Sequence, residues 1–329
     1  MDIKNVNLPI GGFFPEEIGE EKNRLDILFE NTIALKSARS AFNFLIKYLR
    51  VKKVYIPFYI CEVMMEPIKL NNIEYEFYAI DERFAPVFDK SIDKGEYILY
   101  VNYFGLINEK VTKFYAKYKD QLILDNTHAF FADKKMANYS FNSARKFFGV
   151  SDGAFLYVKG IKFDSLNIPP VKNQPARSHL IHLRQGKREV AFKEYQQAES
   201  LMDAEIESIS TYSDNLLNKV DFDFVKERRI ENFNILASKL KKYNLIEVTE
   251  VSNEVPFAYP FLSKTKLERN KLISKGIFFP RLWPNVLEES IKGFSFEKKL
   301  AQDMFPLPID HRWNKHDMNY IVSTIKKEI

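Results

Sequence analysis

An acid and a histidine stand three residues apart at the end of an apolar run, "LILDNTHAFF" (122–131). If this run is a strand of a parallel sheet, Asp125 and His128 lie beyond its carboxyl end, where such sheets bind ligands. Lys146 follows in "SARKFFGVSDGAFLYV" (143–158), just before a glycine turn and a second apolar run. A lysine held between two strands is expected to be buried, and burial lowers its pKa and leaves a nucleophilic amine.

This order of acid, histidine and lysine predicts a site for pyridoxal 5'-phosphate. The lysine would form a Schiff base with the aldehyde, and the acid would keep the pyridine nitrogen protonated so that the ring can accept electrons. Each residue also has a simpler interpretation that the spacing leaves open. Asp125 would then cap the next helix with His128 packed beside it, and Lys146 would be a solvated cation in a surface hairpin.

The first half of the chain alternates helices and strands. We expect helices at 35–50, 61–71 and 109–120, and strands at 53–60, 75–80, 97–104, 121–125, 138–143 and 153–158. Apolar residues at helical spacing mark the first helix, and Ser40 is placed as its cap. Strands that alternate with helices predict an α/β fold with a mostly parallel, doubly wound sheet.

Beyond Val158 the pattern changes to longer helices and short strands. We expect helices at 187–220, 222–243, from Thr265 and at 315–329, and strand-like segments at 245–251, 255–262 and 276–284. Asn314 is placed to cap the last helix. These elements predict a smaller α+β domain over residues 226–329, after a large domain over residues 1–225 that includes the N-terminal segment.

The composition excludes several classes of protein. The single cysteine, Cys61, excludes an internal disulfide and a cysteine-based zinc site; we expect an inert thiol and no bound metal. No run approaches the roughly 18 apolar residues that cross a bilayer, and the N-terminus lacks a signal-peptide pattern, which predicts a cytoplasmic protein without membrane contact. The 49 basic and 44 acidic residues are interspersed, so we expect no nucleic-acid partner.

Four segments resemble the motifs of one known family. They are "KSARSA" (36–41), "IPFYICEV" (56–63), "ILDNTHAFF" (123–131) and "SFNSARKFFGVSDGAFL" (140–156). From about Ala34 to the C-terminus the chain resembles the DegT/DnrJ/StrS sugar aminotransferases, which are pyridoxal-phosphate enzymes of fold type I. The resemblance implies transfer of an amino group from an amino acid, expected to be glutamate, to a keto-sugar that is expected to be linked to a nucleotide. It also implies a homodimer with active sites at the interface.

The resemblance assigns a role to each candidate residue. Lys146 is the Schiff-base lysine, Asp125 faces the ring nitrogen and His128 faces the phenolic oxygen. The cofactor phosphate is assigned to backbone N–H groups and hydroxyls at Ser37, Ala38, Arg39 and Ser40, and to Ser140 or Ser143. Tyr59 is expected to stack on the cofactor ring, because Cys61 stands where the family has an aromatic residue.

The chain departs from the family's pattern after residue 160, where the Asn-Tyr-Arg motif of the dimer interface is missing. Arg184 is the expected substitute, and a plain surface arginine is an equal alternative. Arg145 and Arg312 are expected to hold a substrate phosphate or carboxylate, or else to form ion pairs within the chain. These departures leave open a second class, a protein of this fold without turnover that acts as a regulatory or structural partner. A sugar dehydratase is disfavoured, because those family members replace the lysine with histidine.

Overall fold

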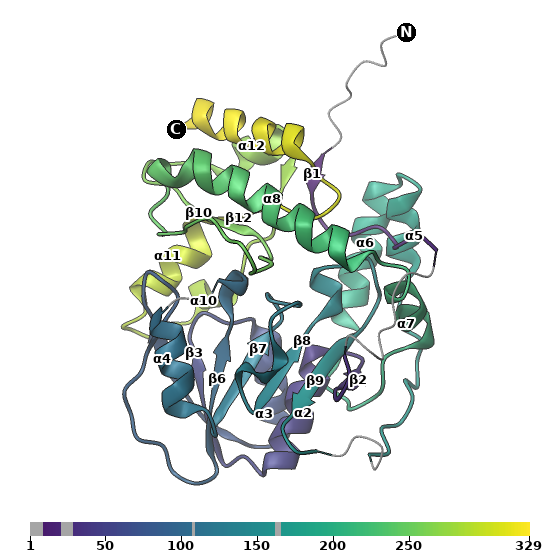
Figure 1. Ribbon diagram of the computed structural model, residues 1–329, viewed down its shortest axis with the longest axis vertical. Helices are drawn as coiled ribbons and strands as arrows, with labels where there is room; N and C mark the ends of the chain where they lie inside the picture. Colours follow the sequence, from purple (N-terminus) through teal and green to yellow (C-terminus); the bar gives the residue numbers. More distant parts are fainter. Residues whose placement is uncertain (1–8, 21–28, 107–108, 162–165) are drawn as a thin grey trace.

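The computed structural model describes residues 9–20, 29–106, 109–161 and 166–329, and its centre is an eight-stranded sheet (Figure 1). The strand order is β2-β9-β8-β7-β6-β3-β4-β5. The strands are β2 (Ile33–Leu35), β3 (Lys53–Pro57), β4 (Glu74–Ile80), β5 (Pro86–Val87), β6 (Glu96–Val101), β7 (Leu122–Asn126), β8 (Tyr139–Asn142) and β9 (Ala154–Val158). The five strands from β8 to β4 run parallel, whereas β2, β9 and β5 pair antiparallel with their neighbours. The predicted α/β fold with a mostly parallel sheet is confirmed.

Short helices connect the strands of the sheet. They are α2 (Ala38–Leu49), α3 (Met65–Leu70) and α4 (Glu109–Tyr118). The apolar face of α2 is buried, with Phe42 and Leu45 fully enclosed. Ser37 caps α2, since its side chain accepts a hydrogen bond from the backbone N–H of Ser40. The prediction that Ser40 is the cap was therefore wrong, because the helix begins three residues earlier than that assignment requires.

The predicted helix at 187–220 is two separate helices in the structure, α6 (Arg188–Ser200) and α7 (Thr211–Leu217), and α5 (Ser178–Arg184) precedes them. Between α6 and α7 the chain is extended and lies along the edge of the sheet, where Leu35 pairs with Ser208 and the N–H of Lys36 donates to the carbonyl of Glu207. This long-range pairing replaces the helical hydrogen bonds that local propensity favours.

The C-terminal part consists of helices around a two-stranded sheet. Its elements are α8 (Phe222–Leu240), β10 (Tyr259–Leu262), α9 (Arg269–Ser274), β11 (Ile277–Phe278), α10 (Asn285–Glu288), α11 (Ser295–Asp303), β12 (Met304–Leu307) and α12 (Lys315–Glu328). Strands β10 and β12 pair antiparallel, and α8 and α12 lie side by side across this part of the molecule (Figure 1). The predicted strand at 245–251 is irregular, because only the neighbouring Asn244 makes a bridge, with Ser263.

Two features link the parts of the chain on either side of the predicted domain boundary. Residue 225 lies in the first turns of α8, so one helix crosses the expected boundary. Strand β1 (Ile10–Gly11) pairs in parallel with β11, which attaches the first described residues to the C-terminal part. A Cβ at Gly11 would lie 1.9 Å from the carbonyl oxygen of Phe278, and its φ is +90°, so this close pairing requires glycine.

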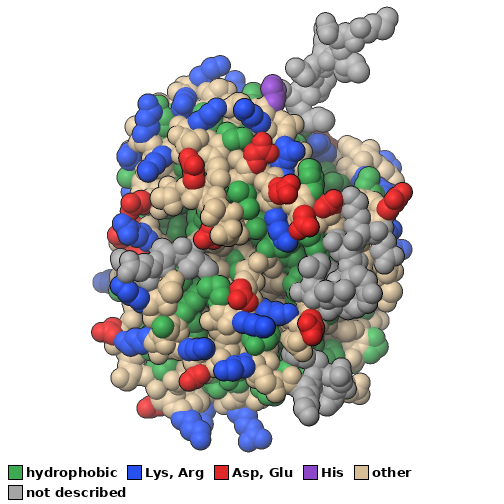
Figure 2. Space-filling model, viewed as in Figure 1, with side chains coloured by type: hydrophobic (Ala, Val, Ile, Leu, Met, Phe, Trp, Pro, Cys, Tyr) green, Lys and Arg blue, Asp and Glu red, His purple; other side chains and the backbone are tan. Residues whose placement is uncertain are grey.

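The surface in Figure 2 mixes the two signs of charge. Lysine and arginine side chains alternate with aspartate and glutamate over this face and form no continuous basic stripe. Among the described residues, no helix is long and apolar enough to cross a membrane.

The last helix offers a direct test of capping. Asn314 and Asp317 form a capping box at the start of α12, as the sequence predicted for Asn314. We expect Asn314→Ala to lower the free energy of unfolding by about 1 kcal/mol, because buried apolar residues of α12 depend on this helix end. Urea denaturation measures the loss, and Lys315→Ala, at an exposed position in the same turn, is the control. Equal stability of the two variants would contradict the role of the cap.

Candidate active site

Three predicted residues meet at the carboxyl end of the central strands. Strand β7 lies between β6 and β8, so Asp125 is opposite Val101 and Phe141 in the middle of the sheet. Lys146 ends a short 3-10 turn after β8, and its Nζ lies 3.3 Å from Nε2 of His128. The fold therefore brings the acid, the histidine and the lysine to one edge of the sheet.

Burial controls the charges of Asp125 and His128. Burial raises the pKa of Asp125, while its hydrogen bonds from Thr127 and the positive charge of Lys146 partly oppose the rise. Burial, together with the charge of Lys146, lowers the pKa of His128 well below its ordinary value. His128 is thus neutral near pH 7, so one ring nitrogen donates and the other accepts. Its buried Nδ1 has no partner among the described residues.

Lys146 itself is only partly buried, which corrects the expectation of a fully enclosed amine. Its Nζ lies 5.7 Å from the centre of the Phe257 ring. The simpler interpretation of a lysine in a surface hairpin fails, because the amine contacts the fully buried His128.

Two aromatic residues that the sequence analysis missed pack on His128. The ring of Phe257 stacks at 4.4 Å with an interplanar angle of 13°, and that of Trp283 at 5.5 Å with an angle of 10°. Both belong to the C-terminal part, within segments that the sequence pattern identified only as strand-like. Trp283 has a φ of +59°, so its backbone is in the left-handed region that a bulky residue rarely adopts. The richness of these segments in aromatic residues was the only available signal.

Tyr59 does not occupy the place expected of a residue that stacks on a ligand. Its side chain is fully buried, and it packs edge-on against Trp283 with 4.5 Å between ring centres. A ring without exposed surface has no face open to a ligand. Trp283, against which Tyr59 packs, is the residue that stacks on His128. Burial raises the pKa of the Cys61 thiol, in agreement with the expected inert cysteine.

The N-terminus of α2 lies beside the turn that carries Lys146. The carbonyl of Lys36 accepts from the N–H of Gly153 at 2.8 Å, and the carbonyl of Gly153 accepts from the N–H of Ala144 at 3.0 Å. The backbone N–H groups of Ala38 and Arg39 make no hydrogen bond with any described residue. Two free donors at a helix N-terminus suit an anion.

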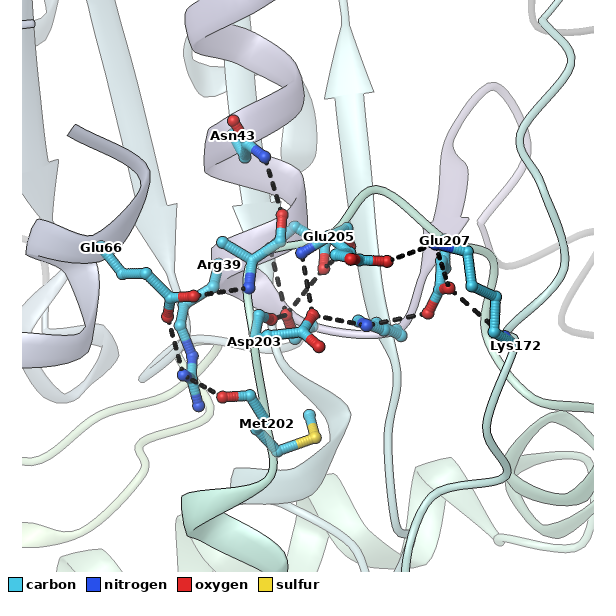
Figure 3. A network of polar contacts seen from close by, with 12 residues as sticks. Arg39, Asn43, Glu66, Lys172, Met202, Asp203, Glu205 and Glu207 are labelled. Carbon is cyan, nitrogen blue, oxygen red and sulfur yellow. Dashed lines mark hydrogen bonds and ion pairs between the residues drawn. The ribbon is translucent and has the colours of Figure 1, made fainter. Parts of the chain in front are cut away.

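The side chains of this turn of α2 contact the chain itself (Figure 3). The hydroxyl of Ser37 donates to the carbonyl of Asp203 at 3.4 Å, and that of Ser40 donates to the carbonyl of Glu205 at 2.6 Å. The guanidinium of Arg39 lies 3.0 Å from the carboxylate of Glu66. The two hydroxyls predicted to bind phosphate are therefore used by a segment that the sequence analysis had assigned to a helix.

The two serines near Lys146 lie on different sides. Phe141 contacts Phe42 of α2, and side chains alternate along a strand, so Ser140 points to the opposite face of the sheet. There the hydroxyl of Ser140 donates to the carbonyl of Lys134 at 2.9 Å. Ser140 is thus not placed to bind a group at the N-terminus of α2. Ser143 is buried directly after β8 and remains the better placed of the two.

The three arginines predicted to bind substrate are paired within the chain. Arg145 forms an ion pair with Glu199 of α6, and Arg184 lies 2.8 Å from Glu16. Arg312 bonds both carboxylate oxygens of Asp310, at 2.6 and 3.0 Å, and also donates to backbone carbonyls of the N-terminal segment. The alternative of internal ion pairs is the arrangement in the structure.

Comparisons with known proteins establish the fold. No family model and no curated protein sequence matches the chain. Among solved structures, PseC of Helicobacter pylori, an aminotransferase of pseudaminic acid biosynthesis, aligns with 97% of this chain and 98% of its own, at 14% identity and a TM-score of 0.68. The aminotransferase TlmJ of Streptoalloteichus hindustanus aligns over 97% and 98%, at 12% identity and a TM-score of 0.69.

A third similar structure was solved in a PLP-form. The putative sugar aminotransferase Spr1654 of Streptococcus pneumoniae, in its PLP-form, covers 97% of this chain and 98% of its own, at 14% identity and a TM-score of 0.64. The chain therefore has the fold of the sugar aminotransferases, as the resemblance implied. At such low identity the likeness extends to the fold, and the chemistry has to be argued from the site.

The depressed pKa of His128 predicts a pH dependence of stability. The folded state excludes a proton that the unfolded chain binds below its ordinary pKa of about 6.5, so stability falls as the pH drops through that value. This group alone contributes a slope of up to about 1.4 kcal/mol per pH unit. We expect His128→Gln to have a flatter profile than the wild type between pH 6 and 5, measured by urea denaturation. His316→Gln, at an exposed helix start, is the control; parallel profiles for wild type and His128→Gln would refute the buried neutral histidine.

Proposed function

We propose that this protein is a pyridoxal-phosphate-dependent aminotransferase that moves an amino group from an amino acid, glutamate in particular, to a nucleotide-linked keto-sugar. The observation that carries the proposal is the contact of Lys146 with His128 beside the buried Asp125. The fold supports it, because one of the similar structures, the putative sugar aminotransferase Spr1654, is known in a PLP-form and in a PMP-form.

The described residues fit this cofactor at both ends. At the ring end, a buried carboxylate, a neutral histidine with an unpaired Nδ1 and a lysine amine lie together. At the phosphate end, Ala38 and Arg39 offer free N–H groups on a helix N-terminus. Asp125 would hold the pyridine nitrogen, His128 the phenolic oxygen and Lys146 the aldehyde carbon. When bound, the cofactor supplies an electrophilic carbon and a ring that draws electrons from the donor's α-carbon.

Each residue of the site would then have a distinct role in the reaction. Lys146 Nζ would take the proton from the donor's α-carbon and pass it to the carbon that was the cofactor's aldehyde carbon. His128, being neutral, accepts or donates a hydrogen bond at Nε2 without placing a second positive charge beside the amine. Phe257 and Trp283 exclude water from the His128 side. Asp125 favours a cationic ring nitrogen, because a buried carboxylate is stabilised by an adjacent positive charge.

We also propose a cytoplasmic homodimer whose interface adjoins the active sites. Three apolar side chains on and after α6 are strongly exposed in the single chain: Val190, Phe192 and Leu201, at 47%, 51% and 73%. Apolar side chains that are strongly exposed on a helix favour contact with a second copy. The single cysteine suits a reducing compartment.

A second function is supported by the paired arginines. Because Arg145, Arg184 and Arg312 are each bound to an internal carboxylate, none of them is free to grip a substrate acid. A protein of this fold that binds the cofactor without turnover, as a regulatory or structural partner, is consistent with that arrangement.

The assignment of Lys146 is tested by chemical labelling. Borohydride reduction of the protein loaded with pyridoxal phosphate should fix the cofactor on Lys146, because its amine is the one beside His128 and Asp125. Peptide mapping by mass spectrometry locates the label. Lys146→Arg should lose both the label and the visible absorption band, whereas Lys172→Arg, on the surface, should keep them. Label on any other lysine would mean that the site is misassigned.

The role of Asp125 is tested by Asp125→Asn, which keeps the shape and the hydrogen bond from Thr127 but removes the charge. We expect the single-turnover rate of the glutamate half-reaction to fall about a hundredfold or more, with cofactor still bound. Asp133→Asn, at the cap of a surface turn, is the control. An unchanged rate would reduce Asp125 to a structural residue. A wild-type spectrum that glutamate, glutamine, aspartate and alanine all leave unmoved would favour the partner without turnover.

A further inference from the structure

Residues 202–207 cover the first turns of α2 from one side (Figure 3). The amide of Asn43 donates to the carbonyl of Ala204 at 2.7 Å, and Arg39 donates to the carbonyl of Met202 at 2.5 Å. The N–H of Ala204 in turn donates to Glu66 at 3.0 Å. The segment is therefore fastened to the helix whose free N–H groups face the proposed cofactor phosphate.

This segment brings two carboxylates to the one lysine at the helix start. Nζ of Lys36 lies 2.6 Å from Asp203 and 2.8 Å from Glu207, and the lysine is 7% exposed. Burial lowers the pKa of Lys36, but the hydrogen bonds to the two carboxylates outweigh it and raise the pKa above its ordinary value. The lysine also lowers the pKa of Asp203, against the opposing effect of burial. Both groups are charged at pH 7, and the lysine is fully engaged.

A phosphate bound by the N–H groups of Ala38 and Arg39 would lie beside the ion pairs of Lys36 with Asp203 and Glu207. The two cations beside the Ser37 cap in the sequence, Lys36 and Arg39, are each paired with internal carboxylates. The phosphate would also lie within the first turn of the helix that Asp203 and Glu207 approach. Like charges at short range repel each other, and burial weakens the screening by water.

We propose that Asp203 and Glu207 set the affinity of this site for the cofactor's phosphate by competing with it for Lys36. The inference rests on the proposed function and goes beyond it, since it assigns an affinity-limiting role to two residues of this chain. It requires the wild-type protein to discriminate poorly between pyridoxal phosphate and pyridoxal, which lacks the phosphate. Removing either carboxylate charge would leave Lys36 with a single charged partner, so that the phosphate would compete for it against one negative charge in place of two.

The test compares the dissociation constants of these two aldehydes at low salt, measured by absorbance. Asp203→Asn and Glu207→Gln keep acceptor oxygens for Lys36 but remove one charge each. We expect each to bind pyridoxal phosphate about tenfold more tightly than the wild type, with pyridoxal unchanged. Glu205→Gln is the matched control, because its carboxylate pairs with the exposed Lys172 and only its backbone contacts α2.

The outcomes distinguish a failure of the proposed competition for Lys36 from a failure of the proposed function. If the variants prefer pyridoxal phosphate over pyridoxal no more strongly than the wild type does, the proposed competition is wrong. The proposed function still holds in that case, provided that borohydride labels Lys146. Absence of binding of either aldehyde to wild type and variants overturns both. If Glu207→Gln does not fold, Asp203→Asn decides alone, since the side chain of Asp203 is 47% exposed and tolerates the change.

Discussion

Two backbone hydrogen bonds of Gly153 hold the candidate site together. Its N–H donates to Lys36 at the start of α2, and its carbonyl accepts from Ala144 in the turn of Lys146. Gly153 has a φ of +123°, and a Cβ there would lie 2.9 Å from Ile209, so only glycine fits. Through this one residue the helix N-terminus and the lysine acquire a fixed separation. Every proposed contact with a two-ended ligand, ring at one end and anion at the other, depends on that separation.

The C-terminal part and the N-terminal segment complete the site from outside the sheet. Phe257 and Trp283 cover His128, and Arg312 fastens the N-terminal segment by bonding its carbonyls. That segment reaches the turn after Lys146, where the N–H of Gly149 donates to Glu17 at 3.0 Å. A Cβ at Gly149 would lie 1.6 Å from the carbonyl of Pro15, so the approach again requires glycine. Movement of either cover would change the access of water to the lysine.

The charges around the site are neutralised in pairs across long distances in the sequence. Arg145 pairs with α6, Arg39 with α3, and Lys36 with the segment before α7. Buried ions require such partners, since an unpaired charge out of water is strongly destabilising. The same pairing keeps these cations from acting as free anion receptors. Affinity for a substrate or a cofactor phosphate must therefore come from backbone N–H groups or from exchange of partners.

The sequence by itself determined the alternation of helices and strands in the first half of the chain and the position of three residues at one edge of the sheet. Apolar runs of different spacing specify strands and helices locally. Because the carboxyl ends of parallel strands lie at the same edge of a sheet, the common location of Asp125, His128 and Lys146 was predictable. Local patterns contain no information on partners far away in the chain. The break of the expected helix at 187–220, the covering rings of Phe257 and Trp283 and the internal partners of the arginines were decided by tertiary structure alone. Each depends on a pairing between distant segments, whose free energy outweighs local propensity once the chain is compact.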